Sequence, residues 1–485
     1  MLFNSLDFAI FLPIVFILYW FVTQRNLQLQ NALVVVASYV FYGWWDWRFL
    51  SLIVFSSLID FTIGKLLAKE ERRPHRKLLL WSSILINLGF LGFFKYYNFF
   101  VDNFVQAFSF FGQSIQPNTL NIILPVGISF YTFQTLSYTI DVYHNKLEPT
   151  KSLIDFAAFV AFFPQLVAGP IERASHLLPQ FYVPRQFKFI NLQFGLIRIL
   201  WGLFKKVVIA DRLAILVDAV YQTPESYGGA HFIVASALFA FQIYCDFSGY
   251  SDIAIGTARL FGFKLMENFR SPYFSKSLGE FWRRWHISLS TWFRDYIYIP
   301  LGGSQVNAYR IYLNLIIVFV VSGFWHGAAW TFIIWGALHG SILILEHLFK
   351  GRKALFTNTP ALLVNTLKVL VVFSITTFAW IFFRANTTAD AFYIVQHLFD
   401  FSEPLAQNLR GMTLYLGAPL WKLLASFLLV GLLLLVEYSV NKEKISELII
   451  IKQKPLIRWL LYTSMVVFIL LFGSFEVDQF IYFQF

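Results

Sequence analysis

Long apolar runs separated by short polar segments recur along the whole 485-residue chain. A helix needs roughly 17 to 25 mostly apolar residues to cross the hydrocarbon core of a bilayer, and several runs approach this length. They are residues 8–23, 30–45, 49–64, 78–94, 119–140, 191–210, 229–245, 361–383, 422–440 and 459–474. The pattern predicts an all-α, polytopic integral membrane protein with about 10 to 12 transmembrane helices.

One polar stretch, residues 246–300, interrupts this series. It holds seven basic and five acidic side chains together with His286. Its second half is also rich in aromatic residues, which is unusual for a solvated loop. Apolar side chains recur there at helical spacing, at Phe281, Trp285, Leu289, Trp292 and Tyr296. We therefore expect a helix lying in or just under the membrane interface and packed against the spans.

Glycine and proline break the apolar pattern at three places. Backbone groups that face lipid must be hydrogen-bonded internally, so such breaks mark places where protein or a water-filled cavity replaces lipid. The first, Leu124–Tyr131, is either such a place or a simple proline kink. The second, Phe162–Pro170, has Lys151 and Arg173 at its two ends and is typical of a re-entrant segment. The third is residues 321–330.

Composition supports the membrane assignment, because 58% of the residues are hydrophobic and only 13% are charged. The net charge of +11 would suggest nucleic-acid binding in a soluble protein. Here the basic residues cluster beside the spans, as in cytoplasmic loops, so we expect no nucleic-acid partner. Residues 65–77 and 441–458 are predicted to be cytoplasmic and the N-terminus to lie outside, with the first apolar run retained as a span. We expect one integral domain, residues 1–485.

Common soluble active-site motifs are missing from the sequence. It contains no His-Glu-x-x-His, no phosphate-binding glycine loop and no Gly-x-Ser-x-Gly elbow. A single cysteine, Cys245, excludes an internal disulfide and a metal site built from several thiolates. We expect no bound metal.

The strongest chemical signal is Gly323–Trp330, which contains His326 between two apolar runs. An ionisable residue at membrane depth is costly, so it commonly faces a cavity and has a function. A mostly neutral histidine there is suited to accept a proton from a hydroxyl. The alternative is a core histidine that is hydrogen-bonded to a carbonyl.

Three further polar positions are weaker candidates. His339 has small neighbours, and helix packing is slightly favoured over function. His286 follows Arg283 and Arg284, whose guanidinium groups suit an anionic donor, although a juxtamembrane basic patch explains them equally well. Asp246 and Asp252 are more typical of helix caps than of catalysis.

In this order, the motifs make the chain similar to the membrane-bound O-acyltransferase (MBOAT) family, in its bacterial branch of alginate O-acetyltransferase and teichoic-acid D-alanyl transfer proteins. The motifs that carry the resemblance are Ser38–Tyr42, Leu124–Tyr131, Phe163–Pro170, Asp246–Asp252, Phe281–Ser290, Arg294–Tyr296, Trp325–Gly327 and the closing Phe480–Phe485. One departure is Gly302–Gln305, where relatives often carry Asn and a basic residue after the glycines, and it leaves the details of donor or acceptor recognition open.

The resemblance implies a function and a set of roles. His326 matches the essential histidine of the family and His286 its second catalytic position, while Arg283, Arg284, Trp282, Trp285, Trp325 and Asp246 form the candidate donor-binding set. Core motifs would lie in residues 120–345 and peripheral spans in 1–100 and 360–485. Such proteins pass an acyl group, commonly acetyl, from acetyl-CoA or an acyl carrier protein through a central tunnel. The acceptor is a polysaccharide hydroxyl or an exported SGNH-type acetyltransferase, and the location is the bacterial inner membrane.

Two other functions stay open on the residues alone. A transporter or flippase for a lipid-linked sugar would need paired polar sites along several spans and some trace of duplicated halves, and the sequence has neither. A scaffold that recruits an exported acetyltransferase would not need the chemistry of His326. The acceptor polymer is not specified by the sequence.

Overall fold

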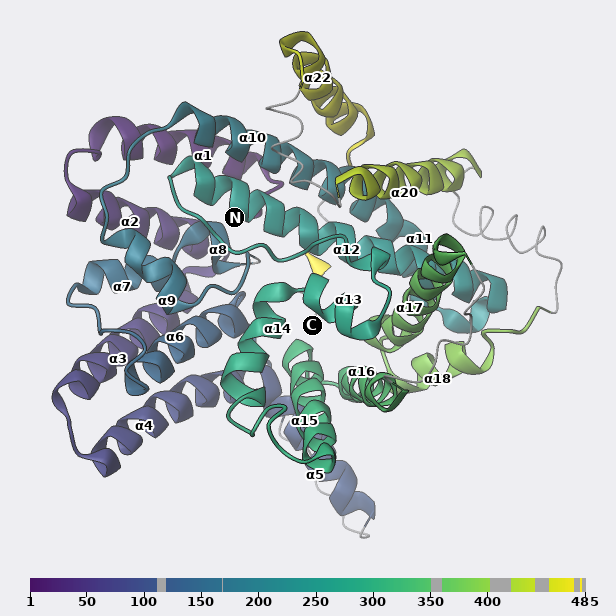
Figure 1. The fold of residues 1–485 in the computed structure, drawn as a ribbon, viewed down its shortest axis with the longest axis horizontal. Helices are drawn as coiled ribbons and strands as arrows, with labels where there is room; N and C mark the ends of the chain where they lie inside the picture. Colours follow the sequence, from purple (N-terminus) through teal and green to yellow (C-terminus); the bar gives the residue numbers. More distant parts are fainter. Residues whose placement is uncertain are drawn as a thin grey trace. The chain divides into compact units, whose positions relative to one another are not determined.

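The computed structural model describes residues 1–110, 119–167, 169–349, 360–401, 420–440, 453–474 and 480–481, and every regular element within these ranges is a helix (Figure 1). Within these ranges, seven helical stretches are long and apolar enough to cross a membrane. The stretches are Leu27–Lys69, Arg73–Ser109, Gly229–Leu260, Ala308–His326, Trp330–Phe349, Ala361–Arg384 and Pro455–Phe472. The predicted all-α, multi-pass membrane architecture is confirmed. Residues 441–452 of the predicted cytoplasmic loop and residues 482–485 of the closing motif lie outside the described ranges.

Two compact units make up the chain. The first contains Met1–Ile199 and Ser251–Met266, and the second contains Leu200–Tyr250 and Glu267–Phe485. Each is described by itself below.

The first unit is built from apolar helices and short helical segments. Its α-helices are α1 (Leu6–Ile17), α2 (Leu27–Asp46), α3 (Leu50–Lys69), α4 (Arg73–Leu91), α5 (Tyr97–Phe110), α6 (Ile128–Tyr143), α7 (Leu153–Val160), α8 (Phe163–Leu166), α9 (Ala174–Leu177) and most of α10 (Phe189–Leu203). Short π-helical turns, η1 (Leu18–Val22) and η3 (Gly92–Tyr96), extend α1 and α4. The 3₁₀ turns η2 (Trp47–Phe49) and η4 (Leu178–Phe181) complete the unit.

Helix α6 begins at Ile128, so residues 119–140 do not form one span with a proline kink. Gly127 precedes the helix with φ of 76°, a left-handed conformation that glycine adopts without a steric penalty. A Cβ atom at Gly127 would also lie 2.7 Å from the carbonyl oxygen of Leu166 in α8. The Tyr42 hydroxyl donates a hydrogen bond to the Val126 carbonyl at 2.9 Å. Three motifs singled out in the sequence therefore meet within this unit.

The second unit contains the polar stretch and the later spans. Its α-helices are most of α12 (Gly229–Leu260), α11 (Asp211–Gln222), α13 (Leu278–Arg284), α14 (Ile287–Phe293), α15 (Ala308–His326), α16 (Trp330–Phe349), α17 (Ala361–Arg384), α18 (Thr388–Gln396), α20 (Leu420–Val440) and α22 (Pro455–Phe472). Its π-helical turns are η5 (Phe204–Ala210) and η8 (Arg294–Tyr298), and its 3₁₀ turns are η6 (Pro224–Ser226) and η7 (Pro272–Phe274).

Helix α12 shows that the predicted capping role of two aspartates is wrong. Asp246 and Asp252 lie inside this 32-residue helix, which continues to Leu260 instead of ending at residue 245. Both carboxylates are buried and pair with cations: Asp246 with Lys206 at 2.7 Å, and Asp252 with Arg198 at 2.8 Å. Charge pairing explains why acidic residues are tolerated in the interior of this helix.

The predicted helix through residues 281–296 is interrupted. Helix α13 ends at Arg284 and α14 begins at Ile287, and His286 lies between them in a left-handed conformation. The predicted buried side is nevertheless correct at Phe281, Trp285, Leu289 and Trp292, which are all at most 4% exposed, whereas Tyr296 is half-buried. The spacing indicated which side chains are buried but not that the backbone turns.

Helices α15 and α16 lie side by side and touch through their backbones (Figure 1). A Cβ atom at Gly323 would meet the Phe332 carbonyl oxygen at 2.2 Å, and one at Gly336 would meet the Phe319 carbonyl oxygen at the same distance. Only glycine permits this approach, which is typical of tightly packed helices in membranes. The pair presents His326 at the C-terminal end of α15.

Candidate functional site

His286 and His326 lie next to each other in the second unit. The centroids of their imidazole rings are 6.4 Å apart, and the side chains are 2% and 5% exposed. His286 comes from the turn between α13 and α14, whereas His326 is the last residue of α15. Two imidazoles from separate segments therefore meet in a buried environment, and histidine is the side chain that most often serves as a general acid or base.

Asn268 fixes the orientation of His286. Its side-chain oxygen Oδ1 accepts a hydrogen bond from the backbone N–H of Ser288 at 3.3 Å and another from the Ser288 hydroxyl at 2.9 Å. A backbone N–H can only donate, so the amide atom that faces this group must be the oxygen. His286 Nδ1 lies 3.0 Å from the same oxygen and must therefore carry the proton. In the neutral ring, Nε2 is then the atom with a free lone pair.

The backbone of His286 is strained. Its φ of 41° and ψ of 55° place a residue with a side chain in the left-handed region, where strain persists only if the surroundings enforce it. A backbone hydrogen bond from Ile287 N–H to the Asn268 carbonyl, at 2.9 Å, holds this turn. Burial keeps the pKa of His286 well below its usual range, and the nearby His326 lowers it further. His286 is therefore neutral at physiological pH.

Aromatic side chains surround the two histidines. The His326 ring lies 5.2 Å from the Trp335 ring and 5.4 Å from the Phe383 ring, both in edge-on geometry. The Phe247 ring lies 4.6 Å from the His286 ring. These rings exclude water, and electrostatic interactions are stronger in such an environment.

The predicted donor-binding residues differ in burial and in their ion pairs. Trp285 is buried in the hydrophobic core of the second unit, and Trp282 packs against that core. Trp325 is partly buried beside His326. Arg284 forms an ion pair with Glu280 of its own helix at 2.7 Å, whereas Arg283 is exposed. Of the two arginines, Arg283 is the one whose guanidinium faces outward.

Asp246 belongs to a buried charged group rather than to the histidine pair. Lys206 Nζ lies 2.7 Å from Asp246 Oδ1 and 2.7 Å from Asp211 Oδ1, and all three side chains are at most 4% exposed. The other carboxylate oxygen of Asp246 accepts a hydrogen bond from the Ile481 backbone N–H at 2.8 Å. This charged group therefore joins three segments of the chain, residues 206–211, the middle of α12 and the segment at Ile481.

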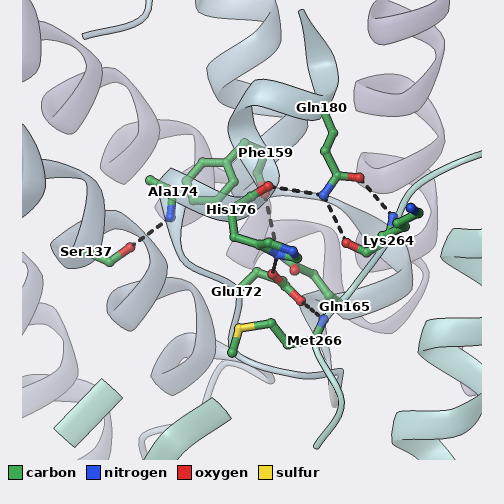
Figure 2. A network of polar contacts seen from close by, with 9 residues as sticks. All are labelled: Ser137, Phe159, Gln165, Glu172, Ala174, His176, Gln180, Lys264 and Met266. Atoms are coloured by element: carbon green, nitrogen blue, oxygen red, sulfur yellow. Dashed lines mark hydrogen bonds and ion pairs between the residues drawn. The ribbon is translucent and has the colours of Figure 1, made fainter. Parts of the chain in front are cut away.

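The first unit holds a second polar network, which follows the predicted re-entrant segment (Figure 2). The buried carboxylate of Glu172 accepts a hydrogen bond from His176 Nδ1 at 2.6 Å and one from the Met266 backbone N–H at 2.5 Å. Gln180 bonds both the N–H and the carbonyl of Lys264 at 2.9 Å. Burial raises the pKa of Glu172, and the bond to Glu172 raises the pKa of His176. These hydrogen bonds hold residues 264–266 against the segment around α9.

Sequence reasoning missed several of these residues. Lys206 lies within the predicted span 191–210, and an ionisable residue there was a usable signal. Glu172 and His176 are four residues apart, a spacing that brings two side chains together on a helix. Asn268 carries no such signal, because its role depends on a chain reversal that brings it back to His286.

Comparisons with known proteins agree with the sequence motifs. A family model described as "MBOAT, membrane-bound O-acyltransferase family" matches residues 147–385. The chain is 42% identical over 422 residues to a probable alginate O-acetylase AlgI of Pseudomonas aeruginosa, covering 85% of this chain and 78% of that protein. It is 36% identical over 425 residues to a peptidoglycan O-acetyltransferase of Helicobacter pylori, covering 82% and 79%. It is 26% identical over 266 residues to a teichoic acid D-alanyltransferase of Bacillus subtilis, covering 52% and 66%.

Proposed function

The chain belongs to the membrane-bound O-acyltransferase family, and from this premise we propose that it transfers an acetyl group from a cytoplasmic thioester to a hydroxyl of an extracytoplasmic polysaccharide. The donor is acetyl-CoA or an acyl carrier protein. The acceptor is an exopolysaccharide of the alginate type, reached directly or through an exported SGNH-type acetyltransferase. The location is the inner membrane of a bacterium, where a multi-pass protein has access to a cytoplasmic thioester on one side and to envelope polymers on the other.

The observation that carries the proposal is the pairing of His286 and His326 in one buried, aromatic environment, with their ring centroids 6.4 Å apart. His326 acts as the general base and accepts the proton of the acceptor hydroxyl. The hydroxyl oxygen forms a bond to the thioester carbonyl carbon, the carbon–sulfur bond breaks, and His326 passes the proton to the departing thiolate. The products are an ester and a thiol, so the step balances without a metal or a redox cofactor.

His286 has a different role in this scheme. Its Nδ1–H is held by Asn268, and the ring is neutral, so Nε2 is available as a hydrogen-bond acceptor. It orients the hydroxyl or the departing thiol. Trp282, Trp285, Trp325, Arg283, Arg284 and Asp246 remain proposed donor-binding residues, and of these the exposed Arg283 is the best placed to meet an anionic part of the donor.

Substitution of His326 tests the proposal. General-base catalysis contributes about 10²- to 10⁴-fold in rate, so His326→Ala should reduce O-acetyl ester in the envelope polysaccharide by at least about 100-fold. Ester is measured by alkaline release of acetate from purified polymer, and the amount of inserted protein by immunoblotting of membranes. His347→Ala, an exposed histidine of α16, is the matched control and should keep full ester. Wild-type ester in the His326→Ala strain would refute the proposal.

A further inference from the structure

The chain passes from the first unit to the second between Met266 and Glu267. This passage lies in residues 261–271, which form no helix and join α12 to η7. Two residues after Met266 comes Asn268, whose side chain orients His286. The end of the first unit and the residue that fixes the proposed catalytic tautomer are therefore neighbours along the chain.

Two side chains of the first unit hold the linking segment, residues 264–266, by its backbone (Figure 2). Gln180 accepts a hydrogen bond from the Lys264 N–H and donates one to the Lys264 carbonyl, both at 2.9 Å. Glu172 Oε1 accepts a hydrogen bond from the Met266 N–H at 2.5 Å. These bonds fix the backbone as far as the last residue of the first unit.

A buried carboxylate is an unusual partner for a single backbone N–H. The Glu172 side chain is fully buried, and burial of a carboxylate is costly unless it is paired and hydrogen-bonded. His176 Nδ1 supplies the pairing at 2.6 Å. A carboxylate gives a stronger bond than a neutral amide would, because hydrogen bonds to an ionised acceptor are shorter and about twice as strong. The choice of Glu172 therefore favours a rigid position for Met266.

A rigid Met266 limits where Asn268 can lie. Only Glu267 separates the two residues, so their Cα atoms are at most about 7 Å apart. Displacement of Met266 would shift the Asn268 amide, whose oxygen must stay within hydrogen-bonding distance of His286 Nδ1, 3.0 Å in the structure. We propose that Glu172 is a positioning residue: by holding Met266 it keeps Asn268 in place to orient His286. This role rests on the function proposed above.

Thiol release from acetyl-CoA tests the role of Glu172. Initial rates are measured in everted membrane vesicles, which expose the cytoplasmic face and retain the endogenous acceptor, and kcat is normalised to inserted protein by immunoblotting. Glu172→Leu should lower kcat by about 10-fold, the rate equivalent of one hydrogen bond, with KM for acetyl-CoA within about twofold of the wild type. Glu172→Gln keeps an acceptor oxygen for the Met266 N–H and should retain kcat within about threefold. Equal losses in the two variants overturn the proposal.

A double variant separates positioning from a general loss of stability. If Glu172 acts through Asn268, its removal has little left to disturb once the Asn268 amide is gone. Glu172→Leu combined with Asn268→Leu should therefore be no more than about twofold slower in kcat than Asn268→Leu alone. Independent effects multiply, so a further loss of about 10-fold in the double variant overturns the proposal.

Thr139→Val is the matched control in the first unit. The Thr139 hydroxyl donates at 3.1 Å to Oδ1 of Asp60, another fully buried carboxylate. Valine has a similar shape but no hydroxyl, so the variant should lower stability and leave kcat per inserted protein at the wild-type value. A loss of kcat in Thr139→Val equal to that in Glu172→Leu overturns the proposal, because any weakened carboxylate contact of the first unit would then have the same effect.

Two further variants complete the design. If Glu172→Leu does not insert, Gln180→Leu takes its place, since it removes both bonds to Lys264, and a wild-type kcat in that variant then overturns the proposal. His326→Ala should abolish thiol release if the proposed function holds. If His326→Ala releases thiol at the wild-type rate, the proposed function fails whatever the Glu172 variants show. If His326→Ala is inactive and Glu172→Leu keeps the wild-type kcat, only the positioning role fails.

Discussion

Replacement of Asn268 by leucine should reduce turnover while leaving the donor affinity unchanged. Oδ1 of this fully buried side chain accepts three hydrogen bonds, one from His286 Nδ1 and two from Ser288. Leucine has a similar volume but no acceptor. Each hydrogen bond contributes about 1 kcal/mol net, so the variant should lose about 3 kcal/mol of folding free energy.

The effect on activity follows from the tautomer. Without Oδ1 the proton on Nδ1 loses its acceptor at 3.0 Å, and the Nε2 lone pair that we propose to act in the reaction is lost in part of the population. Loss of a partner that fixes the tautomer of a metal-bound histidine typically costs about 10- to 100-fold in activity, and we expect an effect of the same size here. We expect that loss in kcat for thiol release from acetyl-CoA in everted vesicles, with KM for acetyl-CoA within about twofold of the wild type.

Asn268→Asp is the matched control for this variant. It keeps the acceptor oxygen and adds a negative charge, which favours the protonated imidazole and raises the pKa of His286. The acidic limb of the pH–rate profile should therefore move to higher pH, whereas a merely structural role would lower stability without moving the profile. Wild-type kcat in a folded Asn268→Leu protein, or an unshifted profile in Asn268→Asp, would refute the reasoning.

Three further variants test other parts of the fold. Gly323→Ala places a Cβ 2.2 Å from the Phe332 carbonyl oxygen, so it should cost about 1 to 3 kcal/mol of folding free energy and lower the apparent melting temperature in detergent. Gly431→Ala is the control, because Gly431 has open space around it, and it should raise the melting temperature slightly. Lys206→Met removes the cation that two buried carboxylates share and should cost about 3 to 5 kcal/mol of folding free energy, seen as reduced protein in membranes; equal amounts of variant and wild type would contradict a stabilising ion pair. Because the folded-state pKa of His176 is raised above its usual 6.5, its contribution to stability is present below that pH and is lost as the pH rises through the folded-state pKa. We expect the melting temperature of His176→Gln to fall less as the pH rises from 6.5 through the folded-state pKa. If the melting temperatures of the variant and the wild type fell equally with pH, the contact with Glu172 would not contribute to stability.

The sequence was informative where burial alone decides the structure. Apolar run lengths predicted a multi-pass helical protein, and helical spacing predicted the buried positions of Phe281, Trp285 and Leu289. The sequence was misleading where a residue distant along the chain stabilises a conformation that the local sequence does not favour. Asp246 resembled a cap because an unpaired carboxylate does not belong inside an apolar helix, and the pairing with Lys206 cannot be seen in local sequence. The turn at His286 cannot be predicted from local sequence for the same reason, since Asn268, eighteen residues earlier, holds it.

The N-terminus of α13 has a consequence for how the protein is made. Backbone N–H groups of Leu278 and Gly279 both donate to Glu346 Oε2, which belongs to α16. A helix of seven residues is too short to persist by itself in water. A ribosome completes the α13 sequence more than fifty residues before it reaches Glu346, so the acceptor does not yet exist when that sequence emerges. We therefore expect residues 278–284 to stay unstructured until α16 has entered the bilayer, and the site to assemble only after the helices around it are inserted.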